Sequence, residues 1–314
     1  MADDGGMSFR SAVRHSAGLI AISLGFEDLV HEKRPQDFPR VTTRDHFTVE
    51  YDGDGSRVPR RLLPNPIRGV VETFQNAGAV RMTDGRAVTD YETAGEIPGW
   101  DTDDAPEEVL VFVHGWLADE ENGLGRFSLL RYMMREHGYE HPVVGFSWDA
   151  DQQGVEWRNG VEIAAKNGPK LAQFLHDYRE RNPDTRIRVL SNSLGSEVVL
   201  EALHALDRAG LEDEVDTLAM MGAASPASFV SRRGRYGDPI GRAADEVHSF
   251  WIPHDGTLLG PYRLADEVDA IGSGAHPEDT PSNFHAHRVD VPDHFSFYLK
   301  DDGCIPELLE VFED

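Results

Sequence analysis

The sequence predicts an α/β fold in which a mainly parallel sheet carries helices on both faces. Three observations support this prediction. From about residue 106 onward, short valine-rich apolar runs alternate with segments of helical periodicity. The apolar runs are too short for helices, and continuous apolar character is typical of strands buried on both faces. With 39% hydrophobic residues, the chain can also bury a sizeable core.

Six apolar runs are predicted as strands. They span residues 108–115, 142–148, 186–190, 215–224, 246–255 and 284–291. The clearest helices are predicted over residues 125–138, 154–181 and 195–209. In the second helix, apolar residues recur with the spacing of one helical face: Leu171, Phe174, Leu175 and Tyr178. The dipeptide Gly168-Pro169 either kinks this segment or begins a new helix, because proline disrupts helical hydrogen bonding.

Residues 1–105 differ in character and are predicted to be an N-terminal extension or cover, whose role the sequence does not reveal. They include a candidate helix at 8–24 and a strand near Asp45 that leads into a Pro-rich, arginine-bearing loop. A further segment at 68–88 is typical of a helix or a hairpin. The more clearly organised domain is predicted to span residues 106–314.

The chain is strongly acidic, with 56 Asp and Glu against 30 Lys and Arg and a formal net charge of -26. Four of the basic residues are lysines, and the acidic residues are spread along the chain. Because phosphates would be repelled, nucleic acids and anionic membranes are unfavourable partners. Excess carboxylate keeps a protein hydrated while concentrated salt screens its self-repulsion. The composition predicts a halophilic protein of a high-salt cytoplasm, and an ordinary acidic protein is the alternative.

Cysteine usage and hydropathy also agree with a cytoplasmic location. Cys304 is the only cysteine, which excludes an intrachain disulfide and cysteine-based metal sites. The apolar run at 17–26 is too short to span a bilayer, and no clear signal peptide is seen. No later segment is long and apolar enough to cross a membrane, so stable membrane insertion is not expected.

Chemistry-bearing residues follow four of the predicted strands. The tripeptide His114-Gly115-Trp116 ends the first strand, and Ser193 lies in a Ser-Asn-Ser-Leu-Gly turn after the third. Asp255 ends the fifth strand, and His294 lies just beyond the sixth. In a parallel sheet the carboxyl ends of the strands meet at one edge, where ligands bind. The sequence therefore predicts a hydroxyl, a carboxylate and an imidazole at the same edge.

The chain order Ser, Asp, His, with a His-Gly loop upstream, resembles the α/β-hydrolase superfamily, specifically its compact, lipase-like members. The resemblance covers the predicted main domain and none of the first hundred residues. It implies that Ser193 is a nucleophile on a strained strand-to-helix turn, that His294 is its base, and that Asp255 orients the imidazole. It further implies an oxyanion hole formed by the backbone N–H groups of Leu194 and Trp116.

Each assignment has an alternative. Ser191 stands where the family most often has glycine, and Ser193 also fits a residue that caps the following helix. The carboxylates that compete for the role of the acid fall in a predicted helix: Asp266, Glu267 and Asp269. The imidazoles that compete for the role of the base fall in or before the sixth strand: His285 and His287. His114 is expected to pack under the oxyanion loop.

The gap between the fourth and fifth strands, about twenty residues at 225–245, is too short for a full lid domain. Phe229 and Tyr236 in this gap are candidates for the rim of the site. Three arginines there either bind an anionic substrate group or offset nearby carboxylates: Arg232, Arg233 and Arg235. Phe146 and Trp148, near a strand end, line an apolar acyl pocket or pack in the core.

The sequence thus predicts a serine hydrolase that cleaves a carboxylic ester through an acyl-enzyme on Ser193. Such an esterase or lipase-like enzyme would act on a small-molecule ester or lipid-like substrate, without a metal or an organic cofactor. Two alternatives are a non-catalytic binding or scaffold protein of the same fold, and a hydrolase of thioesters, amides or carbon–carbon bonds. The sequence predicts neither the natural substrate nor the oligomeric state.

Overall fold

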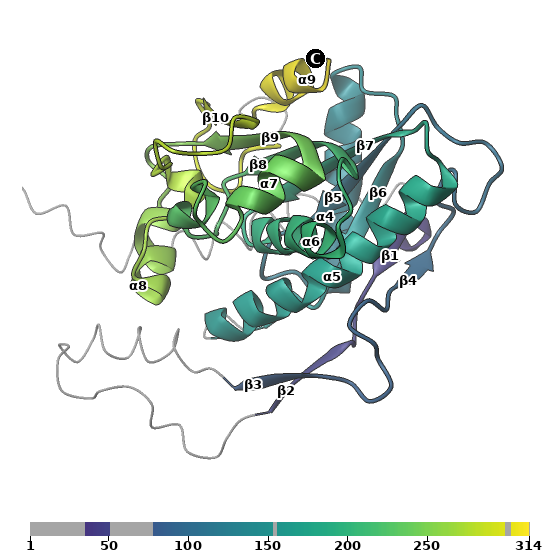
Figure 1. The fold of residues 1–314 in the computed structure, drawn as a ribbon, viewed down its shortest axis with the longest axis horizontal. Helices are drawn as coiled ribbons and strands as arrows, with labels where there is room; N and C mark the ends of the chain where they lie inside the picture. Colours follow the sequence, from purple (N-terminus) through teal and green to yellow (C-terminus); the bar gives the residue numbers. More distant parts are fainter. Residues whose placement is uncertain (1–34, 51–77, 153–155, 299–302, 314) are drawn as a thin grey trace, which may run out of the picture.

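The computed structural model describes residues 35–50, 78–152, 156–298 and 303–313. Its main sheet contains β1 (Arg40–Thr42), β4 (Glu92–Ala94), β5 (Glu108–Val113), β6 (Val143–Ser147), β7 (Arg186–Asn192), β8 (Val215–Met221), β9 (Ala244–Trp251) and β10 (Phe284–Arg288). The strand order is β10-β9-β8-β7-β5-β6-β1-β4 (Figure 1). Every neighbouring pair is parallel except the edge pair β1 and β4, so the predicted mainly parallel sheet is confirmed.

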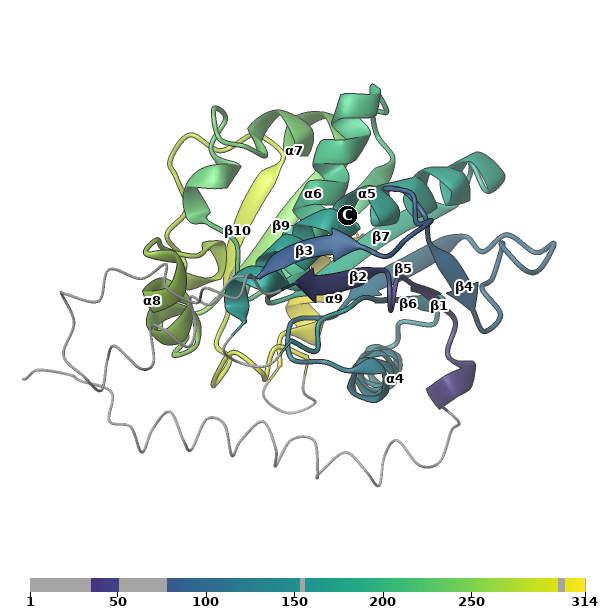
Figure 2. The same ribbon diagram turned by 90° about the horizontal axis from the view of Figure 1, so that it is seen from below.

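Helices cover both faces of this sheet, as Figure 2 shows. One face carries α5 (Trp157–Arg181), α6 (Gly195–Ala209) and α7 (Gly237–Ala243), and the other carries α4 (Glu120–Glu136) and α9 (Ile305–Glu313). The short helical turns are η1 (Pro35–Asp37), η2 (Ala227–Val230), η3 (Leu258–Tyr262), α8 (Arg263–Asp266) and η4 (Ile271–Ser273). None of the helices in the described part of the chain has both the length and the apolar character that a membrane span needs.

Two hydrophobic cores lie on opposite sides of the sheet, because successive side chains of a strand point to opposite faces. In β5, Val109, Val111 and Val113 pack in the core beneath α5 and α6. Leu110 and Phe112 of the same strand pack in the second core, with α4 and α9. All six residues of β5 are buried, which explains why this strand reads as a continuous apolar run.

The N-terminal segment contributes to the same sheet. β1 pairs with β6 and β4 pairs with β1, two strands that the sequence analysis did not predict. A separate hairpin is formed by β2 (Phe47–Glu50) and β3 (Ala79–Met82), and β3 lies within the segment predicted as a helix or a hairpin. Buried Lys170 of α5 donates from Nζ to the carbonyls of Ala87 and Asp90, at 3.0 and 2.9 Å. The candidate helix at 8–24 lies outside the described residues.

The segment around Gly168-Pro169 does not begin a new helix, contrary to one of the two expectations. α5 runs as a single helix from Trp157 to Arg181 with Pro169 inside it. Gly168 lies where α5 crosses α6, and a Cβ at this position would overlap Glu201. Close packing of the two helices therefore overrides the local tendency of glycine and proline to break a helix.

Candidate active site

Ser193 lies at the tip of a sharp turn between β7 and α6. Its φ angle of 54° is in the left-handed region, which is strained for a residue with a Cβ. Its backbone N–H donates to the Met221 carbonyl of the neighbouring strand at 3.0 Å, which fixes the turn to the sheet. A Cβ at Gly195 would lie 2.6 Å from the Val113 carbonyl oxygen, so only glycine fits two residues after Ser193.

A hydrogen-bonded chain joins the serine, the histidine and the aspartate predicted from the sequence. His294 Nε2 lies 2.8 Å from Ser193 Oγ, and His294 Nδ1 lies 2.7 Å from Asp255 Oδ2. The Asp255 carboxylate is fully buried, and its Oδ1 accepts the N–H groups of Thr257 and Leu258 at 3.0 and 2.9 Å. Since a carboxylate accepts from Nδ1–H, Nε2 carries the lone pair that receives the serine proton.

Four of the five residues that compete with Asp255 and His294 have other partners, namely His285, His287, Asp266 and Asp269. His287 Nε2 lies 2.9 Å from His248 Nδ1, and His285 pairs with Glu246 at 2.7 Å. Both are in β10, away from the loop that carries His294. Among the competing carboxylates, Asp266 accepts the indole N–H of Trp157, and Asp269 pairs with Arg263.

The loop after β5, residues 114–117, lies against the serine. A Cβ at Gly115 would be only 2.9 Å from Ser193 Cβ and 3.0 Å from the Asn192 carbonyl oxygen. Neither the N–H of Trp116 nor that of Leu194 donates to a group within the described residues. Among the described residues, these two backbone donors are therefore unpaired, one in the loop and one at the start of α6.

The His114 side chain, at the start of this loop, is fully buried. Its ring stacks on Trp148, with centroids 5.7 Å apart, and Nδ1 lies 2.8 Å from the Gly115 carbonyl oxygen. Burial, followed by the charges of Arg44 and Arg126, holds the pKa of His114 well below its usual value. The ring is thus neutral, donating from Nδ1 and accepting at Nε2 from Arg44 at 3.3 Å.

Two arginines that no sequence motif marks, Arg126 and Arg44, contact the loop at residues 114–117. Arg126 of α4 donates to the carbonyls of Gly115, Trp116 and Leu117. Arg44 reaches Ser147 Oγ and the Asp119 carbonyl as well as His114. No sequence motif marks either residue, since the acceptors are main-chain atoms or distant side chains.

Phe146 and Trp148 belong to the core and do not line an open acyl pocket. Both side chains are fully buried. The Trp148 indole donates to the His114 carbonyl at 2.9 Å, which explains why its polar edge tolerates burial. Phe229 is half-buried, and its ring packs edge-on against Tyr236 with centroids 5.7 Å apart.

A buried acidic cluster lies along α6, behind Ser193. The Tyr236 hydroxyl lies 2.8 Å from Glu197 Oε1 and 2.7 Å from Glu201 Oε1. Ser225 donates to Glu197 Oε2 at 2.8 Å, and burial raises the pKa of Glu197. Arg235 pairs with Glu201, so this arginine offsets a carboxylate, one of its two expected roles.

In the described part of the chain, cavities lie at opposite edges of the sheet. The smaller, about 290 Å³, is lined by Asp45, Phe47, Val49, Asp149, Asp151, Gln152, Glu156 and Ile163. It adjoins the loop at residues 114–117, because Gln152 accepts the indole N–H of Trp116 at 3.2 Å. Burial raises the pKa of Asp149 in this cavity to about 6.

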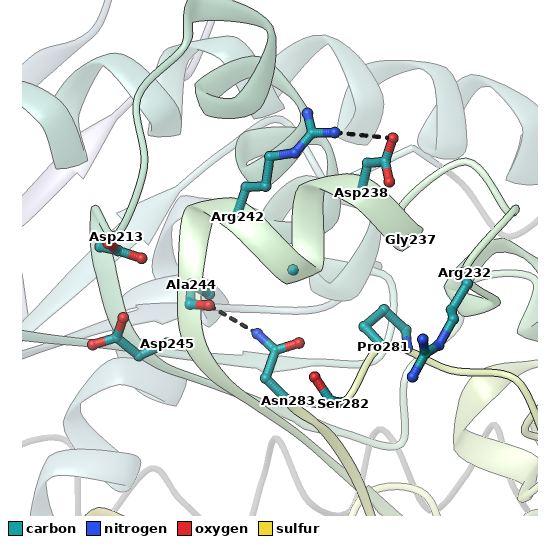
Figure 3. Close-up of a pocket in the computed structure, with 11 residues that line it drawn as sticks. Asp213, Arg232, Gly237, Asp238, Arg242, Ala244, Asp245, Pro281, Ser282 and Asn283 are labelled. Carbon is teal, nitrogen blue, oxygen red and sulfur yellow. Dashed lines mark hydrogen bonds and ion pairs between the residues drawn. The ribbon is translucent and has the colours of Figure 1, made fainter.

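The larger cavity, about 460 Å³, is shown in Figure 3. Its lining includes Ala244, the first residue of β9, and Asn283, which immediately precedes β10. Because these strands run parallel to β7, their first residues lie at the edge of the sheet opposite Ser193. Arg242 and Asp238, labelled in Figure 3, form an ion pair at 3.3 Å and are therefore remote from the serine.

Several solved structures are similar to this chain at low identity. Est1E of Butyrivibrio proteoclasticus, solved with ferulic acid, is 12% identical, with a TM-score of 0.41, over 66% of this chain and 88% of that one. The RedJ thioesterase of Streptomyces coelicolor is 15% identical, with a TM-score of 0.39, over 66% of this chain and 85% of that one. The acetyl xylan esterase core of Trichoderma reesei is 13% identical, with a TM-score of 0.33, over 59% of this chain and 84% of that one.

A relative and a family are also found by sequence. The uncharacterized protein alr1448 of Nostoc sp. (strain PCC 7120) is 22% identical over 125 residues. The match covers 33% of this chain and 33% of that protein, so the chain spans about a third of that relative's length. The sequence model of the family described as "Alpha/beta hydrolase of unknown function (DUF900)" matches residues 101–293, more than half of the chain. This chain therefore belongs to that α/β-hydrolase family.

Proposed function

We propose that this protein is a serine hydrolase that cleaves carboxylic esters through an acyl-enzyme on Ser193. The observation that carries the proposal is the hydrogen-bonded chain from Ser193 through His294 to Asp255, at 2.8 and 2.7 Å. A residue that only caps a helix needs neither a left-handed backbone nor an imidazole on its hydroxyl. Both features are what a nucleophile on a strand-to-helix turn requires.

In the acylation half-reaction, Ser193 Oγ attacks the ester carbonyl carbon while its proton passes to His294 Nε2. The carbonyl π electrons move to oxygen and create a tetrahedral oxyanion. Asp255 stabilises the imidazolium that forms and holds its Nδ1–H in the required tautomer. The imidazolium then donates its proton to the leaving alkoxide, the ester C–O bond breaks, and an alcohol departs.

In deacylation, the same groups act on water. His294 takes a proton from a water molecule, whose oxygen attacks the acyl carbon of the serine ester. The second tetrahedral intermediate collapses as the imidazolium returns the proton to Ser193 Oγ. The carboxylic acid leaves, and the free serine is restored.

The negative charge of each tetrahedral intermediate requires donors that are already oriented. We assign this role to the backbone N–H groups of Leu194 and Trp116, which have no acceptor among the described residues. Leu194 is also at the start of α6, where the helix dipole favours negative charge. In serine hydrolases each such donor contributes about 2.7–4 kcal/mol of transition-state stabilisation.

The substrate class proposed is a small-molecule or lipid-like ester, and the working environment proposed is a cytoplasm of high salt. The net charge of -26 supports the second point, since concentrated salt screens repulsion among carboxylates.

A fluorophosphonate probe tests the proposal, with all measurements in multimolar potassium chloride. The wild type should be labelled, and Ser193→Ala should not. Ser191→Ala is the matched control, because it removes a buried hydroxyl two residues away and should leave labelling intact. Absence of labelling in the wild type would favour a binding or scaffold protein.

Substrate assays then separate the hydrolase classes. p-Nitrophenyl esters of increasing chain length distinguish an esterase preference from a lipase-like one. Matched thioester and amide substrates, compared by kcat/KM, show whether the oxygen ester is preferred. A labelled enzyme that cleaves a thioester or amide better than the ester would refute the ester assignment alone.

A further inference from the structure

We propose that Arg126 is a positioning residue for the oxyanion hole. Its guanidinium donates hydrogen bonds to three consecutive carbonyls of the loop and thereby directs the Trp116 N–H toward Ser193. This inference rests on the proposed function. Arg126 touches neither the serine nor the position of the substrate carbonyl, and it acts through the loop backbone.

The contacts of Arg126 are all to main-chain oxygens. Nη1 donates to the Gly115 carbonyl at 3.3 Å and to the Trp116 carbonyl at 3.2 Å. Nη2 donates to the Leu117 carbonyl at 3.2 Å. Arg126 is half-buried and comes from the second turn of α4, the helix that follows this loop in the chain. A planar guanidinium can serve three acceptors at once in a fixed geometry, which a lysine ammonium on a flexible stem does not reproduce.

Peptide planarity turns these contacts into an orientation of the N–H groups. In a trans peptide the C=O and the following N–H point in opposite directions. The Gly115 carbonyl faces Arg126, so the N–H of Trp116, on the other side of the same peptide, faces away from the guanidinium. A Cβ at Gly115 would lie 2.9 Å from Ser193 Cβ, so the Gly115–Trp116 peptide borders the turn that carries the serine.

The conformation of this loop calls for donors at its carbonyls, which Arg126 supplies. Three successive carbonyl dipoles that point to one side repel one another, and they need donors to offset the repulsion. Leu117 also has a φ angle of 57°, a strained value for leucine. The next residue, Ala118, donates its N–H to the Ala150 carbonyl at 3.1 Å. Residues 115–117 therefore connect the end of β5 to a second hydrogen-bonded residue.

A second contact makes the arrangement specific to the Gly115–Trp116 peptide. The Gly115 carbonyl also accepts the Nδ1–H of neutral His114 at 2.8 Å. Donors on a carbonyl polarise the whole amide and strengthen the N–H on its far side. Arg126 and His114 therefore both orient the Trp116 N–H and make it a better donor to the oxyanion.

The test compares Arg126→Ala with Arg131→Ala. Arg131 is on the same helix, is half-buried and has the same charge, but it stacks on the Phe38 ring and does not contact the loop. With a p-nitrophenyl ester, Arg126→Ala should lower kcat by about 10–100-fold. KM and the pH midpoint of the rate should stay close to the wild type, and Arg131→Ala should keep the wild-type kcat.

Chemical rescue provides a readout that a purely structural role would not change. Millimolar methylguanidinium should restore part of the lost kcat in Arg126→Ala and should have no effect on the wild type. If Arg126→Ala does not fold, Arg126→Lys replaces it: a fall in kcat at an unchanged melting temperature supports the inference.

Other outcomes overturn the inference. A folded Arg126 variant with the wild-type kcat refutes it while leaving the proposed function intact. The same holds if Arg126→Ala loses kcat only as much as Arg131→Ala does, or is not rescued by methylguanidinium. A wild type that reacts neither with fluorophosphonate nor with esters refutes the proposed function, and the inference with it.

Discussion

Substituting Gly115 by alanine is a direct test of the loop that carries the proposed Trp116 donor. The new Cβ would lie 2.9 Å from Ser193 Cβ, whereas carbon atoms pack best at about 3.5–4.0 Å. The loop must therefore move away from the serine by about 0.6–1.1 Å. The Asn192 carbonyl oxygen, 3.0 Å from the same point, prevents the Cβ from being accommodated by a sideways shift.

The expected effect falls on the rate more than on the fold. A displacement of about 1 Å in a positioning group costs on the order of 10²-fold in rate, which corresponds to about 2.7 kcal/mol of transition-state stabilisation. Overpacking costs about 1–3 kcal/mol of the free energy of unfolding. Steady-state kcat/KM, measured beside a denaturation curve, separates the two quantities.

Gly241→Ala is the matched control. Gly241 lies in α7, where an added Cβ meets no heavy atom within 4 Å, so this variant should keep full activity. A folded Gly115→Ala variant with the kcat/KM of the wild type would show that the loop does not supply an oxyanion donor.

Four further predictions concern single groups or the whole surface. Asp255→Asn should lower kcat on the order of 10⁴-fold, as removing the equivalent charge does in other serine hydrolases, while KM for a p-nitrophenyl ester changes little. Asp149 has a pKa of about 6 in the fold, above its unfolded value of about 3.8, so the folded state binds more protons between these pH values and stability falls as pH rises through them. Asp149→Asn should therefore raise the free energy of unfolding by about 1–3 kcal/mol at pH 7 and by almost nothing below pH 4. Urea titrations at both pH values measure this, and equal effects at the two pH values would contradict the prediction. Ser191→Ala should raise the free energy of unfolding by about 1 kcal/mol and leave activity unchanged, because the buried Ser191 hydroxyl has no hydrogen-bond partner among the described residues. A destabilised variant would reveal a partner for this hydroxyl. The thermal midpoint should rise as potassium chloride is increased from millimolar to multimolar concentration, and a midpoint independent of salt would argue against halophilic adaptation.

Much of the fold could be predicted because its strands are buried on both faces. The run at 186–190 and the helix at 195–209 were found within two residues of β7 and α6, since a valine-rich run and a stripe of apolar residues mark them. β1 and β4 were missed because three-residue strands are too short to show any period. The continuity of α5 through Pro169 depends on packing against α6, which local propensity does not encode.

The residues of the candidate site that are positioned by strand order could be predicted from the sequence. Those that are positioned by contacts between particular atoms could not. Ser193, Asp255 and His294 follow three strands whose carboxyl ends share an edge, so strand order alone was sufficient to suggest their proximity. When a strand is buried on both faces, its sequence does not show which aromatic residues line a pocket and which pack in the core. For this reason the sequence left both roles open for Phe146 and Trp148, and the structure shows both side chains fully buried. Arg126 binds backbone oxygens, and such contacts leave no pattern in the sequence.

The cluster behind Ser193 has a consequence for the field at the start of α6. The Tyr236 hydroxyl has one hydrogen but faces two carboxyl groups, so the second hydrogen bond needs a proton on one of them. Burial raises the pKa of Glu197, which favours its protonated form over that of an exposed glutamate. An ionised Glu197 in the first turn of α6 would cancel the positive end of the helix dipole. In its protonated form, Glu197 would leave that partial charge undiminished for the tetrahedral anion proposed to form at Ser193.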